Sequence, residues 1–439
     1  MTVKLTNAQL VEKWSPLLED SQLPSISTTE RKIVTAQLLE NAEVAQASGI
    51  IERVDHPLMD LQEAAPTNNT AGVQNYDPVL ISLIRRAAPK LIAYDLVGVQ
   101  PMTGPSGQVF YMRSRYGNQT GPEAFFNEAN TGHSTVRGGN TSVLGDANLN
   151  IGTYPTGNVS TYNFAGAMAL AQAEALGSAG NTAWREMAMT IDKLTVVANS
   201  RKLKAEYTHE FAQDLKAIHG LDAVRELSNI LATELVSEIN REIIRSVYGV
   251  AKIGSPGSRV TTPGVIDLDV DTNGRWSAER WVGLHFQLEL EANDLAKATR
   301  RGRGNIILCS SNVASALRAA KLLDVTEAQR LQIDDTGNTF AGMMGTTKVF
   351  IDPYATSDFV VVGYKGTSSW DAGLYYCPYT PMQQIKSLTQ DTLTPIIGFQ
   401  TRYGMVQNPF GGGATPIADG KLTPNSNEFY RLSTITHIM

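Results

Sequence analysis

The side chains able to do acid–base, nucleophilic or metal chemistry are scattered along this sequence and match no catalytic signature. The patterns GxxxxGK[ST], HExxH and GxSxG are absent, and no GxGxxG follows a predicted strand. The six histidines have no metal-ligand spacing, and His209 and His219, which flank a predicted helix start, are interpreted as polar surface groups. Chain order alone singles out no Ser-His-Asp triad. We therefore expect no catalytic residue, no metal ligand and no cofactor.

One motif resembles the start of a calcium-binding loop. Asp269, Asp271 and Asn273 place oxygen-bearing side chains at alternate positions before Gly274, and glycine permits the sharp turn that such a loop needs. The closing bidentate glutamate of a standard loop falls on Arg280, a cation where a ligand belongs. We interpret the motif as a turn that leads into the next helix, and calcium binding remains the alternative.

A third pattern concerns chemistry done to the chain by a protease. Five of the seven glutamates before residue 64 follow a Leu or Ile two positions earlier, and none of the fifteen later ones does; the five are Glu12, Glu19, Glu40, Glu52 and Glu63. Helix propensity of Leu and Glu explains part of this pattern but not its absence from later helices. Leu61 and Glu63 directly precede a linker of small and polar residues, where an extended chain is accessible to proteases. We predict cleavage between Glu63 and Ala64.

The segment before that boundary differs from the rest of the chain. Residues 1–63 carry ten acids and five bases, which is most of the net charge of −6. Threonines and Glu30 mark a helix start near Thr28, and apolar residues at helical spacing continue to about Ala47. We predict an acidic helical appendage with little core of its own, which depends on partners.

Behind the linker, hydrophobic spacing predicts a body of alternating helices and strands. The longest helix runs from Ala212 to about Val247 with a break at Gly220, and its part after the break would be about 40 Å long. Other predicted helices cover 77–95 and 277–301, and an extended arm covers 186–204. The predicted strands are 108–113, 348–351, 359–364, 374–376 and 395–401, with a strand–helix unit from Asn305 and a final strand within 427–439.

The long helix carries acids at i, i+4 steps, where like charges repel each other. Glu234, Glu238 and Glu242 form this row. We interpret it as a solvated stripe partly relieved by Arg241 and Arg245; a face that awaits a cationic neighbour is the alternative.

Composition sets the class of protein. A chain of 439 residues with 42% hydrophobic and 18% charged residues folds into two or more domains. It has no apolar run of membrane-spanning length and no secretory leader pattern. Cys309 and Cys377, both in apolar surroundings, are predicted to be buried reduced thiols of a cytosolic protein. The body is nearly neutral and lacks a basic patch, which argues against tight nucleic-acid binding.

Three stretches of the sequence carry a resemblance to a known family: Asp77–Tyr116 (DPVLISLIRRAAPKLIAYDLVGVQPMTGPSGQVFYMRSRY), Ser200–Ile243 (beginning SRKLKAEYTHEFAQDLKAIHG) and Asp267–Ser277 (DLDVDTNGRWS). They resemble the corresponding segments of the major capsid proteins of T-even-like tailed bacteriophages. The resemblance implies the α+β Hong Kong 97 (HK-97) capsid fold, with a long spine helix near 222–247. It also implies a precursor that a phage protease trims after a Glu preceded by Leu/Ile-x, a pattern that Leu61-Gln62-Glu63 matches.

The resemblance implies a division of the chain into capsid domains: propeptide 1–63, N-arm and first peripheral elements 64–104, extended loop 105–116 and 186–205, insertion subdomain 117–185, peripheral domain 206–303, axial domain 304–405 and C-terminal return 406–439.

The implied function is a structural subunit that forms hexamers of an icosahedral head around double-stranded DNA. Implied partners are copies of the chain itself, a scaffold, the prohead protease, the portal, and vertex and decoration proteins. Packaged DNA would be contacted only non-specifically, and no membrane is expected. The alternatives are the related pentameric vertex protein, an encapsulin-like compartment shell and, remotely, an enzyme. The implied location is the virion, after assembly in the host cytoplasm.

Overall fold

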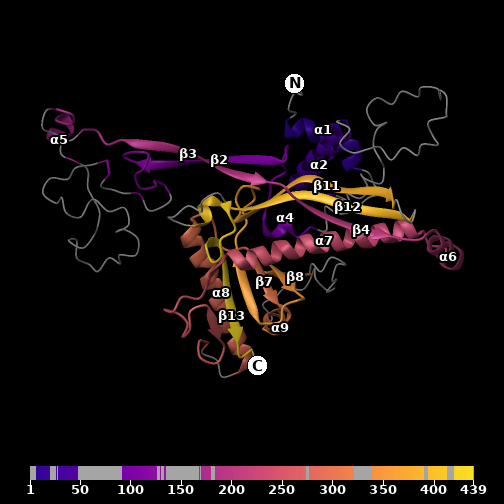
Figure 1. Ribbon diagram of the computed structural model, residues 1–439. Coiled ribbons are helices and arrows are strands. Elements are labelled where there is room, and N and C mark those ends of the chain that lie inside the picture. Colours follow the sequence, from indigo (N-terminus) through magenta and orange to yellow (C-terminus); the bar gives the residue numbers. More distant parts are fainter. Residues whose placement is uncertain are drawn as a thin grey trace. The chain divides into compact units, whose positions relative to one another are not determined.

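The computed structural model describes most of the body and two helices near the N-terminus (Figure 1). The described residues are 6–19, 26, 28–47, 91–125, 129, 133–134, 168, 170–178, 183–272, 276–320, 339–389, 394–412 and 420–438. They mix helices and strands, so the expected α+β class is confirmed. The chain divides into two compact units, one of residues 1–107 and 195–439 and the other of residues 108–194.

In the first unit, the described strands form two sheets. One sheet has the strand order β1-β11-β12-β4. Its strands are β1 (Gly98–Val99), β11 (Leu374–Leu388), β12 (Pro395–Gln407) and β4 (Asn199–Glu206). Strand β1 runs parallel to β11, and the other neighbouring strands are antiparallel. The other sheet has the strand order β5-β13-β10-β7-β9-β8. Its strands are β5 (Ala251–Ile253), β13 (Asn427–Thr436), β10 (Phe359–Gly363), β7 (Ile306–Ser310), β9 (Thr347–Asp352) and β8 (Thr339–Met344). A short β6 (Val265–Asp267) also pairs with β13. The predicted strands within 304–405 therefore lie in two different sheets.

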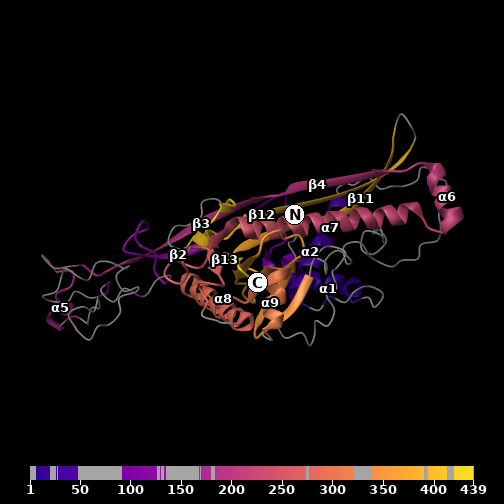
Figure 2. The same ribbon diagram turned by 90° about the horizontal axis from the view of Figure 1, so that it is seen from below.

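The predicted long helix is confirmed, and it is broken where the glycine predicted a break. Helix α6 (His209–His219) ends at Gly220, which has a left-handed φ of 66° that glycine adopts without strain. Asp222 then caps α7 (Ala223–Val250) by accepting a hydrogen bond from the backbone N–H of Val224 at 3.1 Å. The view in Figure 2 shows α7 lying along β4 and β12, with α6 at its N-terminal end.

Helix α7 joins two hydrophobic clusters of the first unit. Its N-terminal half buries Leu231, Leu235 and Val236 against β11 and β12. Its C-terminal half enters the main core through Ile239, Ile243, Ile244, Val247 and Val250, which pack with residues of both sheets. A third cluster lies between the sheet around β7 and the two helices α8 (Ser277–Thr299) and α9 (Ser311–Ala319). One long helix therefore contributes to two clusters, and changes on it affect both.

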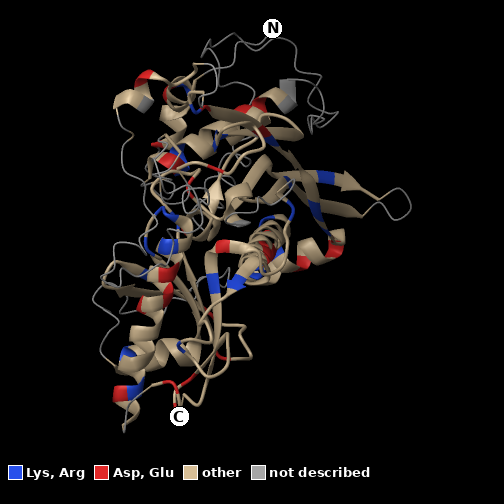
Figure 3. Ribbon diagram, turned by 90° about the vertical axis from the view of Figure 1, so that its left-hand side faces the viewer, with Lys and Arg blue, Asp and Glu red and all other residues tan. Residues whose placement is uncertain are grey.

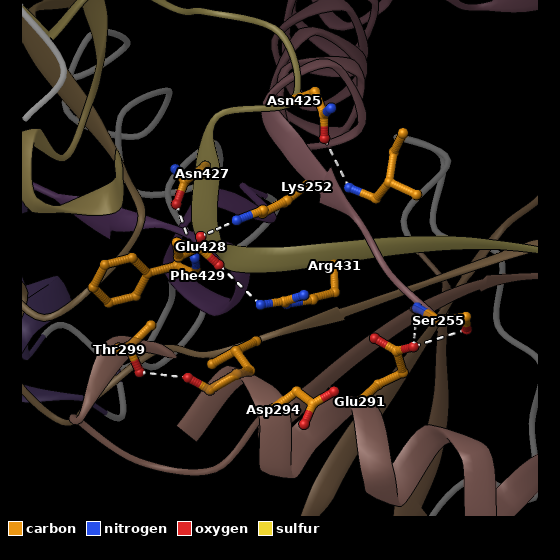
Figure 4. Close-up of polar contacts among 12 residues, drawn as sticks. Lys252, Ser255, Glu291, Asp294, Thr299, Asn425, Asn427, Glu428, Phe429 and Arg431 are labelled. Atoms are coloured by element: carbon orange, nitrogen blue, oxygen red, sulfur yellow. Dashed lines mark hydrogen bonds and ion pairs between the residues drawn. The ribbon is translucent and has the colours of Figure 1, made fainter. Parts of the chain in front are cut away.

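Strand β13 is tied to its neighbours by buried and half-buried polar contacts (Figure 4). Glu428 accepts hydrogen bonds from Lys252 of β5 and, at 2.9 Å, from Arg431. The buried carboxylate of Glu291 on α8 accepts from the backbone N–H and the hydroxyl of Ser255, which follows β5. The contact of Glu428 thus holds β13 to β5, and the contacts of Glu291 hold α8 to the turn after β5.

The described part of the N-terminal segment contains two helices. Helix α2 (Thr29–Ala47) has the predicted bounds, whereas α1 (Asn7–Leu18) was not predicted. Leu10, Trp14 and Leu18 of α1 pack with Ala36, Leu39 and Ala42 of α2 in a small core. The described part of the segment thus has a small core of its own, in line with the expectation of little core material. Residues 77–90 of the predicted helix lie outside the described residues, and α4 (Ala93–Leu96) is a four-residue helix whose N-cap is Ile92.

Both cysteines are free and buried, as predicted. Burial raises the pKa of each thiol, Cys309 and Cys377, to about 12. Because the thiolate is the reactive form, we expect neither cysteine to react with an aromatic disulfide reagent at about pH 8 until the chain is unfolded. Absorbance of the released aromatic thiolate measures this. A Ser258→Cys variant, at an exposed position, should label at once, and equally fast labelling of the native chain would contradict the prediction.

Candidate assembly surfaces

Among the described residues, the chemistry-bearing side chains form one group with metal-ligand spacing. Ligand atoms of Asp267, Asp269 and His437 lie within 4.8 Å of one another, and the last two residues are exposed. His437 Nδ1 lies 2.9 Å from Asp267 Oδ1, and an ion pair links Asp269 to Arg280. Arg280 thus supplies the counter-charge for Asp269, and His437 makes a hydrogen bond with Asp267. His209 and His219 begin and end α6 and are exposed, as predicted.

The residues of the calcium-like motif hold the backbone. Asp271 accepts hydrogen bonds from the backbone N–H groups of Thr261 and Asp267, each at 2.9 Å. Arg280, which stands where the closing ligand would be, pairs instead with Asp269. Asn273 and Gly274 lie outside the described residues, and α8 begins at Ser277 as the turn interpretation requires. The described part of the motif is thus a turn that stabilises the start of α8.

The predicted cleavage residues Leu61, Glu63 and Ala64 also lie outside the described residues. Of the other glutamates with the same pattern, Glu12 lies in α1, Glu19 follows it, and Glu40 lies in α2. Lys13 Nζ and Trp14 Nε1 donate to the carboxylate of Glu40 at 2.8 and 3.2 Å. This glutamate therefore also joins the two N-terminal helices.

The acidic stripe of α7 has a cationic neighbour from the same chain. Arg201 of β4 donates to Glu238 at 2.7 Å and to Glu242, and its Nε donates to the hydroxyl of Tyr403 at 2.5 Å. Burial lowers the pKa of Arg201, but hydrogen bonds to Glu242 and Tyr403 raise it more, so the guanidinium stays charged. The interpretation of this row as a solvated stripe relieved by Arg241 was wrong, because Arg201 pairs with Glu238 and Glu242 and Arg241 pairs with a different carboxylate.

That carboxylate is Asp352 at the end of β9, whose side chain is 1% exposed. Arg241 Nη1 lies 2.7 Å from both of its oxygens, and the hydroxyl of Tyr248 donates to it at 2.8 Å. Asp352 Oδ1 also accepts a hydrogen bond from the backbone N–H of Tyr354 at 3.0 Å. A buried carboxylate with several donors is a rigid anchor between α7 and the sheet around β9.

The second unit contains a two-stranded ribbon with exposed apolar side chains. Strands β2 (Ser106–Tyr116) and β3 (Met187–Val197) pair with each other and run side by side in Figures 1 and 2. The exposed apolar residues on them, each more than half exposed, are Phe110, Met112, Met187, Met189, Ile191 and Val197. A soluble monomer rarely exposes such a row, which marks an interaction surface. A two-stranded ribbon is also marginal by itself in water, so this unit favours contact with another surface.

Charges of both signs are interspersed along the described elements (Figure 3). Several arginines are engaged by carboxylates of the same chain, including Arg201, Arg241, Arg259 and Arg431. Such pairing neutralises cations that would otherwise attract phosphates. None of the helices in the described part of the chain combines the length and apolar character that crossing a bilayer requires.

Comparison with known protein families decides the class of this protein. A family model described as "Major capsid protein Gp23" matches residues 73–435. The chain belongs to the Gp23 family of major capsid proteins. It is thus a structural protein of a tailed-phage head and part of the virion capsid. The α+β class, the long helix α7 and the β2–β3 ribbon are elements that the Hong Kong 97 resemblance implied, and Gp23 membership agrees with that expectation.

Individual relatives agree with the Gp23 assignment over the whole chain. The major capsid protein of Salmonella phage ViI is 37% identical over 99% of each chain, and that of Enterobacteria phage T4 is 35% identical over 94% of each. The capsid vertex protein of phage T4 is 28% identical over 50% of this chain and 52% of its own. Among solved structures, a chain titled Mycobacterium phage Bobi has a TM-score of 0.41 at 9% identity, covering 87% of this chain and 97% of its own. One titled the capsid of Myoviridae phage XM1 has a TM-score of 0.40 at 8% identity, with coverages of 78% and 91%.

Proposed function

We propose that the chain forms hexameric capsomers of an icosahedral head around double-stranded DNA, without catalytic activity of its own. Membership of the Gp23 family supports the role. The observation that carries the assembly step is the exposed apolar ribbon of β2 and β3, with Phe110, Met112 and Ile191 among its side chains. Obligate assemblies often bury about 2,000–5,000 Å² per interface. A thin subunit reaches that area by extending such a ribbon onto a neighbouring copy.

We assign the parts of the capsid fold to the domains that the resemblance implied. The ribbon is the extended loop, formed by residues 105–116 and 186–205, with the insertion 117–185 at its tip. Helix α7 is the spine of a peripheral domain of residues 206–303. Residues 304–405 form the axial domain, 64–104 supply the N-arm, and 406–439 return to the peripheral domain.

We further propose that the head matures by removal of residues 1–63 by a prohead protease, and that scaffold, portal, vertex and decoration proteins share the shell. The support is the row of Leu/Ile-x-Glu sequences that ends at Glu63. The pentameric vertex role is a second candidate, because a vertex protein matches half of the chain. The much longer match to major capsid proteins favours the hexamer.

Cleavage after Glu63 is tested by N-terminal sequencing and intact mass of the subunit from mature particles. We expect wild-type subunits to begin at Ala64. The variant Glu63→Ala should keep residues 1–63 or be cut at another pattern glutamate, because the charge that the protease reads is gone. Glu12→Ala is the matched control, since that glutamate has the same pattern and its loss should leave Ala64 as the first residue. Mature wild-type subunits that still begin at Met1 would refute processing.

A further inference from the structure

Two sides of helix α2 make packing contacts, and one of them packs on α1. Ala36, Leu39 and Ala42 pack with α1. The other face contains Arg31, Val34, Leu38 and Asn41, at spacings of three, four and three residues, which place them on one side of a helix. Val34 is 4% exposed and belongs to the main core of the first unit, and Leu38 packs against that core. This second face therefore contacts the body of the same chain.

The polar contacts of this face reach backbone groups of the body. Asn41 Nδ2 donates to the carbonyl oxygens of Met102 and Tyr379, each at 2.8 Å. The side chain of Gln37 donates to Asn41 Oδ1 at 3.1 Å and thereby orients the amide. Met102 follows β1 and Tyr379 lies in β11, so one amide contacts both segments. Two carbonyls satisfied by one side chain form a specific recognition contact for a helix.

At the other end of α2, Arg31 makes a charged contact. Its Nη2 lies 3.4 Å from Asp95 Oδ2, and its guanidinium carbon lies 5.0 Å from the ring centre of Tyr94. Lys348 lies 3.2 Å from the other oxygen of Asp95. Because both side chains remain partly exposed to solvent and the Nη2–Oδ2 distance is 3.4 Å, this pair contributes orientation more than strength.

The apolar part of the contact is not completely filled. A cavity of about 50 Å³ lies beside Leu38, and the body residues around it are mainly apolar: Leu91, Tyr94, Val236, Ile239, Tyr376, Pro378, Pro381 and Met382. A helix seated on an apolar groove with one unfilled space resembles a bound peptide ligand more than a helix of a continuous core.

We propose that the body carries a helix-binding site whose ligand is residues 29–47 of its own N-terminal segment. The contact is held by Val34, Leu38 and Asn41 and does not depend on the covalent connection through the linker. A cut at Glu63 therefore leaves the segment in place, and the groove stays closed to other copies of the chain. Displacement requires a cut within α2. Glu40, which has the protease pattern, separates Val34 and Leu38 from Asn41, so cleavage there dismantles the ligand.

The experiment uses the full chain with the recognition sequence of a sequence-specific protease placed within 66–72. The N-terminus carries a fluorescent label, the chain is cleaved after folding, and retention of the fragment on the body is followed by size-exclusion chromatography and fluorescence anisotropy. We expect the fragment to remain bound after cleavage. An excess of unlabelled peptide of residues 28–47 should replace it, and the same peptide with Val34→Ser and Asn41→Ala should not.

Variants of the full chain identify the contact. Asn41→Ala should speed release at least about tenfold, because two hydrogen bonds are lost. Asn7→Ala is the matched control, since Asn7 is exposed at the start of α1. Protection of Cys309 and Cys377 from thiol reagents shows that the body remains folded. Immediate release of the wild-type fragment, or equal release from the two variants, would overturn the proposal. Because the cut is made at an introduced protease site, the outcome does not depend on whether a phage protease cleaves at Glu63.

Discussion

Replacement of Arg241 by alanine is expected to destabilise the folded subunit by about 3 kcal/mol. Arg241 is the cation that faces both oxygens of the buried Asp352, and its loss leaves a carboxylate with only Tyr248 and a backbone N–H as donors. An unpaired buried charge is costly because its hydration is not replaced. Urea denaturation of the unassembled subunit, followed by circular dichroism, measures the loss as a lower midpoint at unchanged slope.

The neighbouring Arg245 is the control for this variant. It lies one turn further along α7 and is exposed, so Arg245→Ala should change the free energy of unfolding by no more than about 0.5 kcal/mol. The double variant Arg241→Met with Asp352→Asn removes both charges, and it should lose less stability than Arg241→Ala alone. If Arg241→Ala and Arg245→Ala unfold at the same urea concentration, the buried pair does not anchor α7.

The second large effect is expected at Gly98 in β1. A Cβ at this position would overlap the backbone oxygen of Ser369 and would lie 2.9 Å from Cδ1 of Tyr375. Gly98 is paired with Tyr375 in the parallel register of β1 and β11, so Tyr375 cannot withdraw without disturbing that pairing. Relief of the overlap with Ser369 requires a shift of the loop that carries it. We expect Gly98→Ala to cost about 3 kcal/mol, at the upper end of the usual range for overpacking.

Thermal unfolding of the purified subunit and the yield of closed shells measure the Gly98 effect. Gly104→Ala is the matched change, because its Cβ would meet the nearest atom, the backbone oxygen of Ser106, at an ordinary 3.7 Å. That variant should behave as the wild type. A Gly98→Ala protein with an unchanged melting temperature would show that the loop at Ser369 moves freely, contrary to the packing described.

The helices were predictable because local residues determine them. Gly220 and Asp222 end one helix and cap the next, and the apolar stripe of α7 has the helical period over its whole length. Helix α1 was missed because it contains an internal Pro16 and its apolar residues pack on another helix. Its stability comes from tertiary contacts, which local propensity does not contain.

The strand pairing and the polar contacts were not predictable from the sequence. The strands predicted at 374–376 and 395–401 are parts of β11 and β12, which are longer because they pair with each other. Arg201 and Asn41 carry no local signal for these contacts, because the carboxylates that bind Arg201 and the carbonyls that bind Asn41 lie 37 or more residues away along the chain. For the cleavage site the situation is reversed: the sequence carries the signal at Glu63, and the described structure does not reach it.

The position of β13 has a consequence for the order in which its sheet forms. This strand lies inside the sheet, hydrogen-bonded to β10 on one side and to β5 and β6 on the other, although it follows all three of them in the chain. Until β13 is in place, β5 and β10 have no strand between them and the sheet has a gap. Closure of this sheet is therefore a late, long-range step of folding, and a chain truncated before Asn427 cannot complete it.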